Sequence, residues 1–263
     1  MNIKIIKYFD NDHTLCNTKN TDKYIHKKTS ENTQSIKEKT IMTMNWELFA
    51  WATGLGFIWC QIITHYAVSV GLHRYFAHRQ FKASVAHEWA FLLLILIACV
   101  RTPIGWIASH RMHHADTEGP LDPHNYKELG YWRVALTIWS IPKIPIKYAR
   151  DLYSNPRLVW GHKYWKHFLA VWWIVTFLIS PYLWWAAAFL PFMFAKVGFG
   201  MLNIFGHWHK EDNKGTDGPW MNWILGGDGY HRQHHLYPWK LRLGKYDIGG
   251  YMAEKIWKTT SKK

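Results

Sequence analysis

Apolar residues gather in three blocks that alternate with polar, charged stretches along the chain. The first block, residues 50–72, contains no Lys, Arg, Asp or Glu and is long enough to cross a bilayer as a helix. The second, residues 89–100, is too short to span and predicts an interfacial or re-entrant helix. The third, residues 168–205, has the length of two helices joined by a tight turn near Pro181. This pattern predicts a helical membrane protein that crosses the bilayer several times.

We therefore expect an all-α membrane protein with about three to four transmembrane helices and a cytoplasmic helical cap. The expected membrane domain comprises residues 44–263, with spans at 48–71, 166–181 and 183–205 and an interfacial helix at about 87–101.

Residues 1–43 form a polar segment rich in Lys, Asn and Thr, without the apolar core of a signal peptide. We expect a disordered N-terminal extension. Three spans would place its eight Lys on the side opposite the other basic loops. Either a further crossing exists, or the segment is a non-native extension and the working protein begins near Met42 or Met44; we favour the second interpretation.

Charge and aromatic content refine the membrane placement. The chain has 18 Trp, a residue that favours membrane–water interfaces, and a net charge of +14. Lys and Arg are frequent on both sides of the third apolar block but absent from its central turn, so the positive-inside rule places these basic regions in the cytoplasm. No motif for reading nucleic acid occurs. The expected counterparts of the charge are anionic headgroups or an acidic redox partner.

Cysteine and glycine patterns exclude other chemistries. The three cysteines are isolated, so neither a disulfide framework nor a CxxC metal site is expected. No GxGxxG or GxxxxGK[ST] loop is present, and we expect no nucleotide cofactor within this chain.

Histidines provide the strongest signal for chemistry. Two segments have the form HxxHH, which a helix presents on one face, whereas chance would give roughly 0.07 such matches in a chain with this many histidines. Neutral imidazoles suit iron, copper and zinc, and two such helices facing each other could surround a pair of metal ions. The three groups are HRYFAH with His73 and His78, HRMHH with His110, His113 and His114, and HRQHH with His231, His234 and His235.

The local sequence predicts how each group is held. His73 and His78 are five residues apart, about 140° around an α-helix, so they cannot share a face there and the backbone must bend to aim both rings inward. Gly71 suits the end of the first membrane helix. The helix of the second group should start around Pro103. The helix of the third group follows GGDG, with Asp228 near its N-terminus, and should end at Pro238.

These motifs resemble those of the integral-membrane fatty acid desaturases, in particular the Δ9 acyl-CoA type. The resemblance rests on HRYFAH, HRMHH and GDGYHRQHHLYP, together with ADTEGPLDPHN after the second group. It covers roughly residues 47–245. Asp228-Gly229 stands where the family often has Glu-Gly, a conservative departure.

The resemblance implies a di-iron site in which nine histidines ligate two iron ions, Fe2+ or Fe3+ during turnover. The ninth ligand, His207, lies in an Asn-x-x-x-His motif in which Asn203 would act on one iron through a water. Trp106 matches a residue that lines the substrate tunnel, and His124 would support the ligands from outside. No catalytic residue is expected beyond the metal ligands. The implied ligands are His73, His78, His110, His113, His114, His207, His231, His234 and His235.

The resemblance also implies the reaction and its partners. The expected enzyme is an oxidoreductase of fatty acid biosynthesis that uses O2 and two electrons to place a cis double bond, of Δ9 type, in a saturated acyl chain carried by CoA or a lipid. The sequence has no His-Pro-Gly-Gly haem motif. We therefore expect electrons from a separate protein, cytochrome b5 or ferredoxin, at an active site on the cytoplasmic face.

Two other functions remain open at this point. A histidine-box hydroxylase acting on lipids or alkanes would use similar groups but transfer oxygen to the substrate. A membrane metal carrier or transporter would bind metal without oxygen chemistry and would need a polar path through the bilayer. Only Gln61, His65 and Lys196 could supply such a path.

Overall fold

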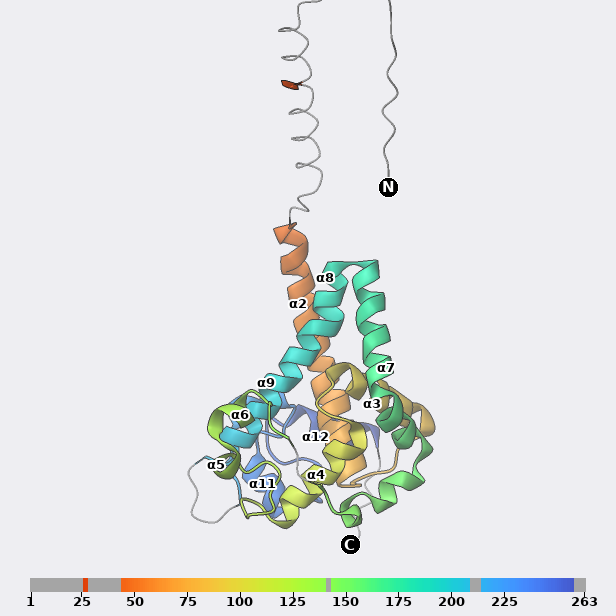
Figure 1. Ribbon diagram of the computed structural model, residues 1–263. Helices are drawn as coiled ribbons and strands as arrows, with labels where there is room; N and C mark the ends of the chain where they lie inside the picture. Colours follow the sequence, from red (N-terminus) through yellow and green to blue (C-terminus); the bar gives the residue numbers. More distant parts are fainter. Residues whose placement is uncertain (1–25, 28–43, 141–142, 209–213, 258–263) are drawn as a thin grey trace, which may run out of the picture. The chain divides into compact units, whose positions relative to one another are not determined.

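The computed structural model describes residues 26–27, 44–140, 143–208 and 214–257. The prediction for residues 1–43 therefore lies almost entirely outside the described residues. In the compact unit that begins at Trp46, the described chain is helical, with one isolated β-bridge between Asp217 and Tyr230, and the predicted all-α class is confirmed (Figure 1). The elements are α2 (Trp46–Ile62), η1 (Ile63–Ala77), α3 (Val85–Ala98), α4 (Pro103–Ala115), α5 (Tyr126–Leu129), α6 (Tyr131–Ala135), η2 (Ile146–Tyr148), η3 (Arg150–Ser154), α7 (Pro156–Ile179), α8 (Pro181–Trp184), η4 (Trp185–Phe189), α9 (Leu190–Phe205), η5 (Pro219–Met221), α10 (Asn222–Leu225), α11 (His231–Leu236) and α12 (Ile248–Ile256).

Two continuous helices are long and apolar enough to cross a membrane. They are Trp46–Ala77, 32 residues made of α2 and η1, and Pro181–Phe205, 25 residues made of α8, η4 and α9. The pair α3 and α4, bent by 87°, forms either a broken span or a re-entrant loop, which would raise the number to three. The predicted span at 166–181 falls in the second half of α7, which is not among these candidates, and it stays a prediction.

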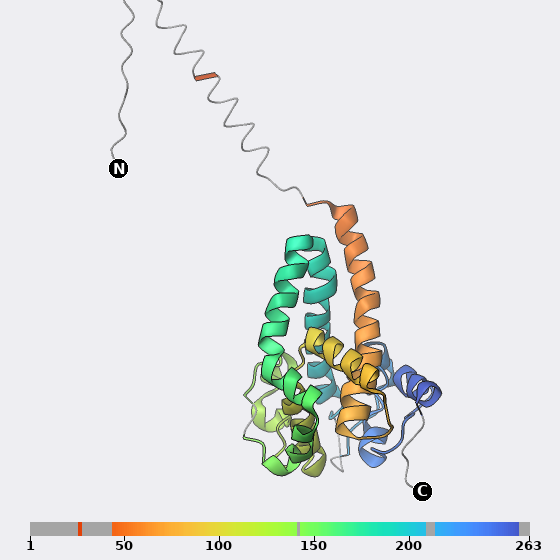
Figure 2. The same ribbon diagram turned by 90° about the vertical axis from the view of Figure 1, so that its right-hand side faces the viewer.

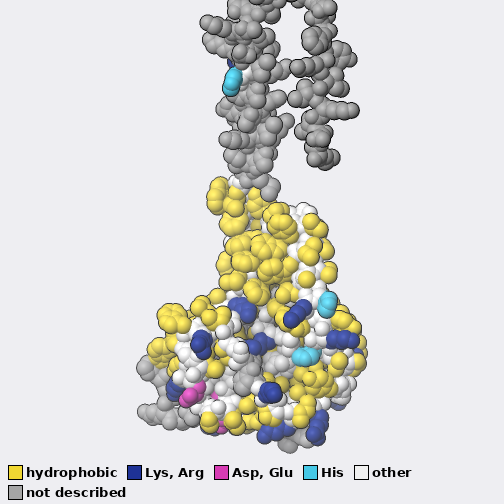
Figure 3. All heavy atoms as spheres, viewed as in Figure 1, with side chains coloured by type: hydrophobic (Ala, Val, Ile, Leu, Met, Phe, Trp, Pro, Cys, Tyr) yellow, Lys and Arg dark blue, Asp and Glu magenta, His cyan; other side chains and the backbone are white. Residues whose placement is uncertain are grey.

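The longer helices form a stem above a layer of short helices. Figures 1 and 2 show α2, α7 and the α8–α9 segment extending together away from the short elements. Large apolar side chains on the stem, such as Leu55 and Ile58 on α2 and Leu178 on α7, are exposed. Figure 3 shows an apolar upper surface and Lys and Arg side chains gathered below it. Together with the two candidate spans, this surface identifies the chain as an integral membrane protein.

Capping residues fix the start of α7 and the turn that joins it to α8. Asn155 caps the start of α7, where Pro156 occupies the first turn. Ser180 follows the last residue of α7, and its side chain accepts a hydrogen bond from the Tyr182 amide at the start of α8. The predicted turn near Pro181 is therefore confirmed.

The bend between α3 and α4 positions the second histidine group. Helix α3 ends at Ala98, because the next residue, Cys99, takes the left-handed conformation with φ 49°. Thr102 then caps α4, which begins at Pro103 as the sequence predicts. The histidines of the second group therefore lie on α4, a separate helix after the bend.

Gly71 does not end the first membrane helix, contrary to the expectation from the sequence. The helix continues to Ala77. A side chain at Gly71 would place its Cβ 2.6 Å from the Phe91 ring, so this glycine allows η1 and α3 to pack closely. His73 is therefore carried by the membrane helix itself, and His78 is the residue that follows its last turn.

Candidate metal centre

Nine histidines from four parts of the chain converge in the cap. In each of two groups, one potential ligand atom per residue lies within 4.8 Å of all the others. The first group is His73, His78, His110 and His234, and the second is His113, His207, His231 and His235.

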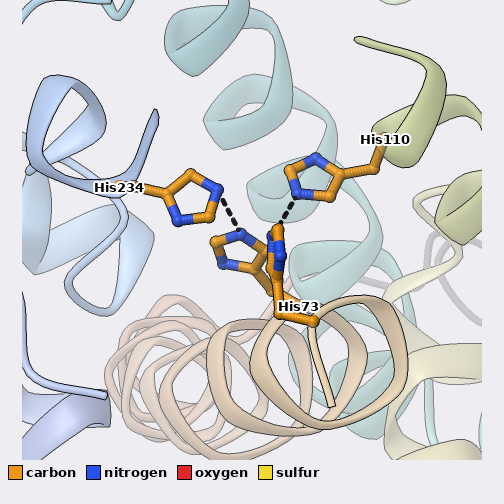
Figure 4. A group of neighbouring side chains, drawn as sticks. His73, His110 and His234 are labelled. Carbon is orange, nitrogen blue, oxygen red and sulfur yellow. Dashed lines mark hydrogen bonds between the residues drawn. The ribbon is translucent and has the colours of Figure 1, made fainter. Parts of the chain in front are cut away.

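The first group joins η1, α4 and α11. Nε2 of His73 lies 3.0 Å from Nε2 of His234, and Nε2 of His78 lies 2.8 Å from Nε2 of His110. Figure 4 shows the rings of His73, His110 and His234 pointing toward one another from three separate elements. The ε-nitrogens thus face a common centre.

The second group joins α4, the turn after α9, and α11. Nε2 of His231 lies 2.8 Å from Nε2 of His207 and 3.1 Å from Nε2 of His235, while His113 and His235 are 3.2 Å apart at the same atoms. The remaining histidine, His114, connects the two groups, because its Nε2 lies 2.7 Å from that of His234 and its ring stacks on His235 at 4.4 Å.

A π-helix resolves the spacing of His73 and His78. The segment Ile63–Ala77 is π-helical, and the His78 amide donates to the His73 carbonyl at 3.1 Å, an i→i−5 hydrogen bond. The wider turn of a π-helix brings residues five apart much closer in angle than an α-helix does. An α-helix could not align these two rings, and the π-helical backbone of η1 does so instead.

The δ-nitrogens of three ligand candidates face carboxylates. The distances from Nδ1 to the nearest carboxylate oxygen are 3.0 Å for His73 and Asp228, 2.8 Å for His113 and Asp122, and 3.2 Å for His207 and Glu118.

Asp228 was expected near the N-terminus of the third histidine helix. The residue before α11 is Tyr230, and no side chain caps that helix. Asp228 instead accepts hydrogen bonds from Ser69 and Arg74 on η1. Asp228 thus lies three residues before α11, as expected, while its carboxylate pairs with the buried Arg74 on η1.

Burial keeps the α11 histidines neutral. Desolvation, with the neighbouring histidines adding to it, lowers the pKa of His231, His234 and His235 well below the ordinary value. A neutral imidazole has a lone pair free for a metal ion. The donor set consists of aromatic nitrogens without a thiolate, which fits iron, copper or zinc, and two groups of four fit two ions.

The other predicted residues lie close to this centre. Trp106 stacks on His110, with ring centroids 4.8 Å apart. Asn203 is buried one turn before His207, and its amide donates to the Phe199 carbonyl at 2.7 Å. The ring of His124 is 5.4 Å from that of His113.

Two cavities lie at the α3–α4 bend, and the smaller one reaches residues that contact the centre. One, of about 340 Å³, is lined by Arg101 and Lys196 together with neutral residues. The other, of about 40 Å³, is mostly apolar and reaches Trp106 and Asp228. Both are lined by Val100, so they are neighbours.

Sequence reasoning missed the buried polar network around the histidines. Arg74 donates to Asp228 and Asp247, and all three side chains are buried. Neither Arg74 nor Asp247 has a spacing signal. The position of Arg74, between the apolar block and His78, was the one available indication, since a charge at that depth needs a partner.

Comparison with known proteins gives a consistent family. The family profile described as "Fatty acid desaturase" matches residues 49–254. An Arabidopsis thaliana "Delta-9 desaturase-like 3 protein" is 26% identical over 230 residues, 81% of this chain and 72% of that protein.

Two further relatives differ in their printed activities. A Bombyx mori "(11Z)-hexadec-11-enoyl-CoA conjugase" is 26% identical over 201 residues, 68% of this chain. The matched region spans 60% of that silkworm protein's length. A Nostoc "sn-2 palmitoyl-lipid 9-desaturase" is 26% identical over 214 residues, 75% of this chain and 74% of that protein.

Proposed function

Because the chain belongs to the fatty acid desaturase family, we propose that it is a fatty acyl desaturase that introduces a cis double bond into a saturated chain. The observation that carries this proposal is the convergence of two four-histidine groups in a buried centre beside an apolar cavity. A neutral nitrogen donor set of this kind is suited to two redox-active ions.

In this proposal the nine histidines hold two iron ions, and Asn203 acts on one of them through a water. The iron pair, when bound, supplies the activation of dioxygen that attack on an unactivated methylene requires. In the balanced reaction, two adjacent methylenes, O2, two electrons and two protons are converted into an alkene and two water molecules. The residues of the cap orient the chain and exclude bulk water from the centre.

The acyl chain is proposed to approach along α4. Trp106 lines the apolar cavity and stacks on His110, so it would set the path of the chain beneath the metal centre. His110 lies about 10 Å along the helix axis from the start of α4. At that start, the cavity with Arg101 and Lys196 suits an anionic headgroup. Acyl-CoA and acyl-lipid substrates both fit this description.

Orientation, electron supply and regiospecificity complete the proposal. The basic cap is assigned to the cytoplasmic face, where cytochrome b5 or a ferredoxin would deliver electrons one at a time. The relatives carry both Δ9 and Δ11 names. We propose Δ9 insertion for this chain on the strength of its motifs.

Expression in a desaturase-deficient host tests the function. The expected result is a cis-monounsaturated fatty acid, identified by gas chromatography with mass spectrometry of an adduct that locates the double bond. The variant H234A should yield none, whereas H162A, on α7 outside both histidine groups, should match the wild type. A hydroxylated chain without an alkene would instead identify a hydroxylase. Bound metal without any lipid product would favour a metal carrier.

A further inference from the structure

Three buried carboxylates lie around the histidine centre without belonging to either four-histidine group, although Asp122 lies close enough to His113 and His124 to form a smaller group of potential ligands with them. They come from different parts of the chain: Glu118 and Asp122 from the turns after α4, and Asp228 from the turn before α11. The side chains of Asp228, Asp122 and Glu118 are 9%, 1% and 3% exposed. Burying three carboxylates costs free energy unless something compensates for their charge.

The geometry of the histidine rings shows what each carboxylate contacts. For His113 and His207, Nδ1 forms a hydrogen bond with a carboxylate while Nε2 faces another histidine of the centre. Nδ1 of His73 lies 3.0 Å from Asp228 but outside hydrogen-bond geometry. A carboxylate opposite Nδ1 favours the tautomer with its proton on that atom. The lone pair is then left on Nε2, on the side where the ε-nitrogens converge.

The carboxylates also affect the net charge of the metal site. Nine neutral imidazoles carry no charge, so two divalent ions would place about four positive charges in a buried site. We propose that Glu118 and Asp122 are positioning residues that hold His207 and His113 in the metal-binding tautomer, and that these two carboxylates and Asp228 supply the negative charge that the all-histidine donor set lacks. This inference rests on the proposed function only in requiring a metal centre.

The three carboxylates are not equivalent. Asp228 forms an ion pair with Arg74, and Glu118 forms one with Lys127. Asp122 has no Lys or Arg partner among the residues that the structure describes. It accepts hydrogen bonds from the backbone amides of Glu118 and His124, both at 2.8 Å. Asp122 therefore offers the cleanest test of charge compensation.

The test compares three variants of the full-length protein in detergent. Asp122→Asn keeps the shape of the side chain and removes its charge, while Asp122→Glu keeps the charge. The control, Asp151→Asn, removes a carboxylate that pairs with Arg111 on the same helix as His113 but contacts none of the nine histidines. Each protein is titrated with Fe2+ and with Co2+, whose visible spectrum reports the ligand geometry, and the reduction potential of the iron form is measured.

The expected result is metal affinity about 10- to 100-fold weaker for Asp122→Asn, with a reduction potential shifted to more positive values. Asp122→Glu should recover most of the potential, and Asp151→Asn should behave as the wild type. Equal metal affinity and potential in Asp122→Asn and the wild type would overturn the proposal. If Asp122→Asn does not fold, an unchanged potential in Lys127→Met, which removes the lysine that pairs with Glu118, would overturn it instead.

The same measurements separate this inference from the proposed function. A wild-type protein that binds two metal ions but forms no alkene would contradict desaturation and leave the carboxylate roles intact. A wild-type protein that binds no metal would contradict both.

Discussion

Replacing Arg74 with Met should strongly destabilise the membrane unit. Its guanidinium is 1% exposed and lies 3.1 Å from Asp228 and 2.9 Å from Asp247. It also donates to the carbonyls of Ser69 and Leu241, both at 3.0 Å. Methionine fills a similar volume but leaves two buried carboxylates without a cation. Removing one member of a buried ion pair costs about 3–5 kcal/mol.

That cost predicts a measurable change in thermal stability. For a domain of roughly 200 residues, 1 kcal/mol shifts Tm by about 2–4 °C, so Arg74→Met should lower Tm by about 6–20 °C. The assay is thermal unfolding of the detergent-solubilised protein, followed by fluorescence-detected size-exclusion chromatography. Metal is removed first, so that binding does not contribute to the measured stability.

A matched control lies on the next turn. Arg79 also pairs with an aspartate, Asp151, but its side chain is 63% exposed. Arg79→Met should cost about 0–1 kcal/mol, because water screens exposed pairs. The double variant Arg74→Met with Asp247→Asn should recover part of the lost stability. A fall in Tm for Arg74→Met no larger than that for Arg79→Met would refute this reasoning about buried charge.

Three further predictions follow from the geometry. His234→Ala should lose metal and activity together, since its ring contacts both His73 and His114; full iron content with retained turnover would contradict its assignment as a ligand. Burial lowers the pKa of the α11 histidines. The folded protein therefore binds fewer protons than the unfolded chain below about pH 6.5, and acidification should destabilise it. Metal content after dialysis should persist at pH 6 and fall at lower pH, whereas complete loss of metal at pH 6 would be inconsistent with neutral ligands. Gly227→Ala should lower Tm, because φ is +112° and the new Cβ would lie 1.8 Å from Asp247 Oδ1; an unchanged melting curve would exclude that clash.

The sequence predicted the elements whose ends are set by local chemistry. Pro103 begins α4, Pro181 begins α8, and α11 ends before Pro238. Proline and capping residues act within a few positions, so their effects can be read without knowing the fold. The HxxHH spacing likewise indicated which rings share a face, and both triplets lie on helices as predicted.

Features that depend on distant partners could not be predicted. The π-helix at Ile63–Ala77 has no residue signature, because it reflects the packing of η1 in the folded protein. The contact between His73 and Asp228 joins segments that only the tertiary fold brings together. For the same reason, the sequence indicated that Asp228 lies near the start of α11 but not that its carboxylate contacts Ser69 and Arg74 on η1.

The ion pair between Arg74 and Asp247 also limits when the protein can fold during its synthesis. These residues are 173 positions apart, and His73 is 161 positions from His234. At about 5–20 residues per second, a ribosome needs roughly 10–35 s to travel from Arg74 to Asp247. For most of that interval the first membrane helix carries Arg74 and His73 before their partners Asp228, Asp247 and His234 have been synthesised. The nascent chain therefore cannot assemble a complete metal centre until His231, His234 and His235 have emerged, which makes metal loading a late step of biogenesis.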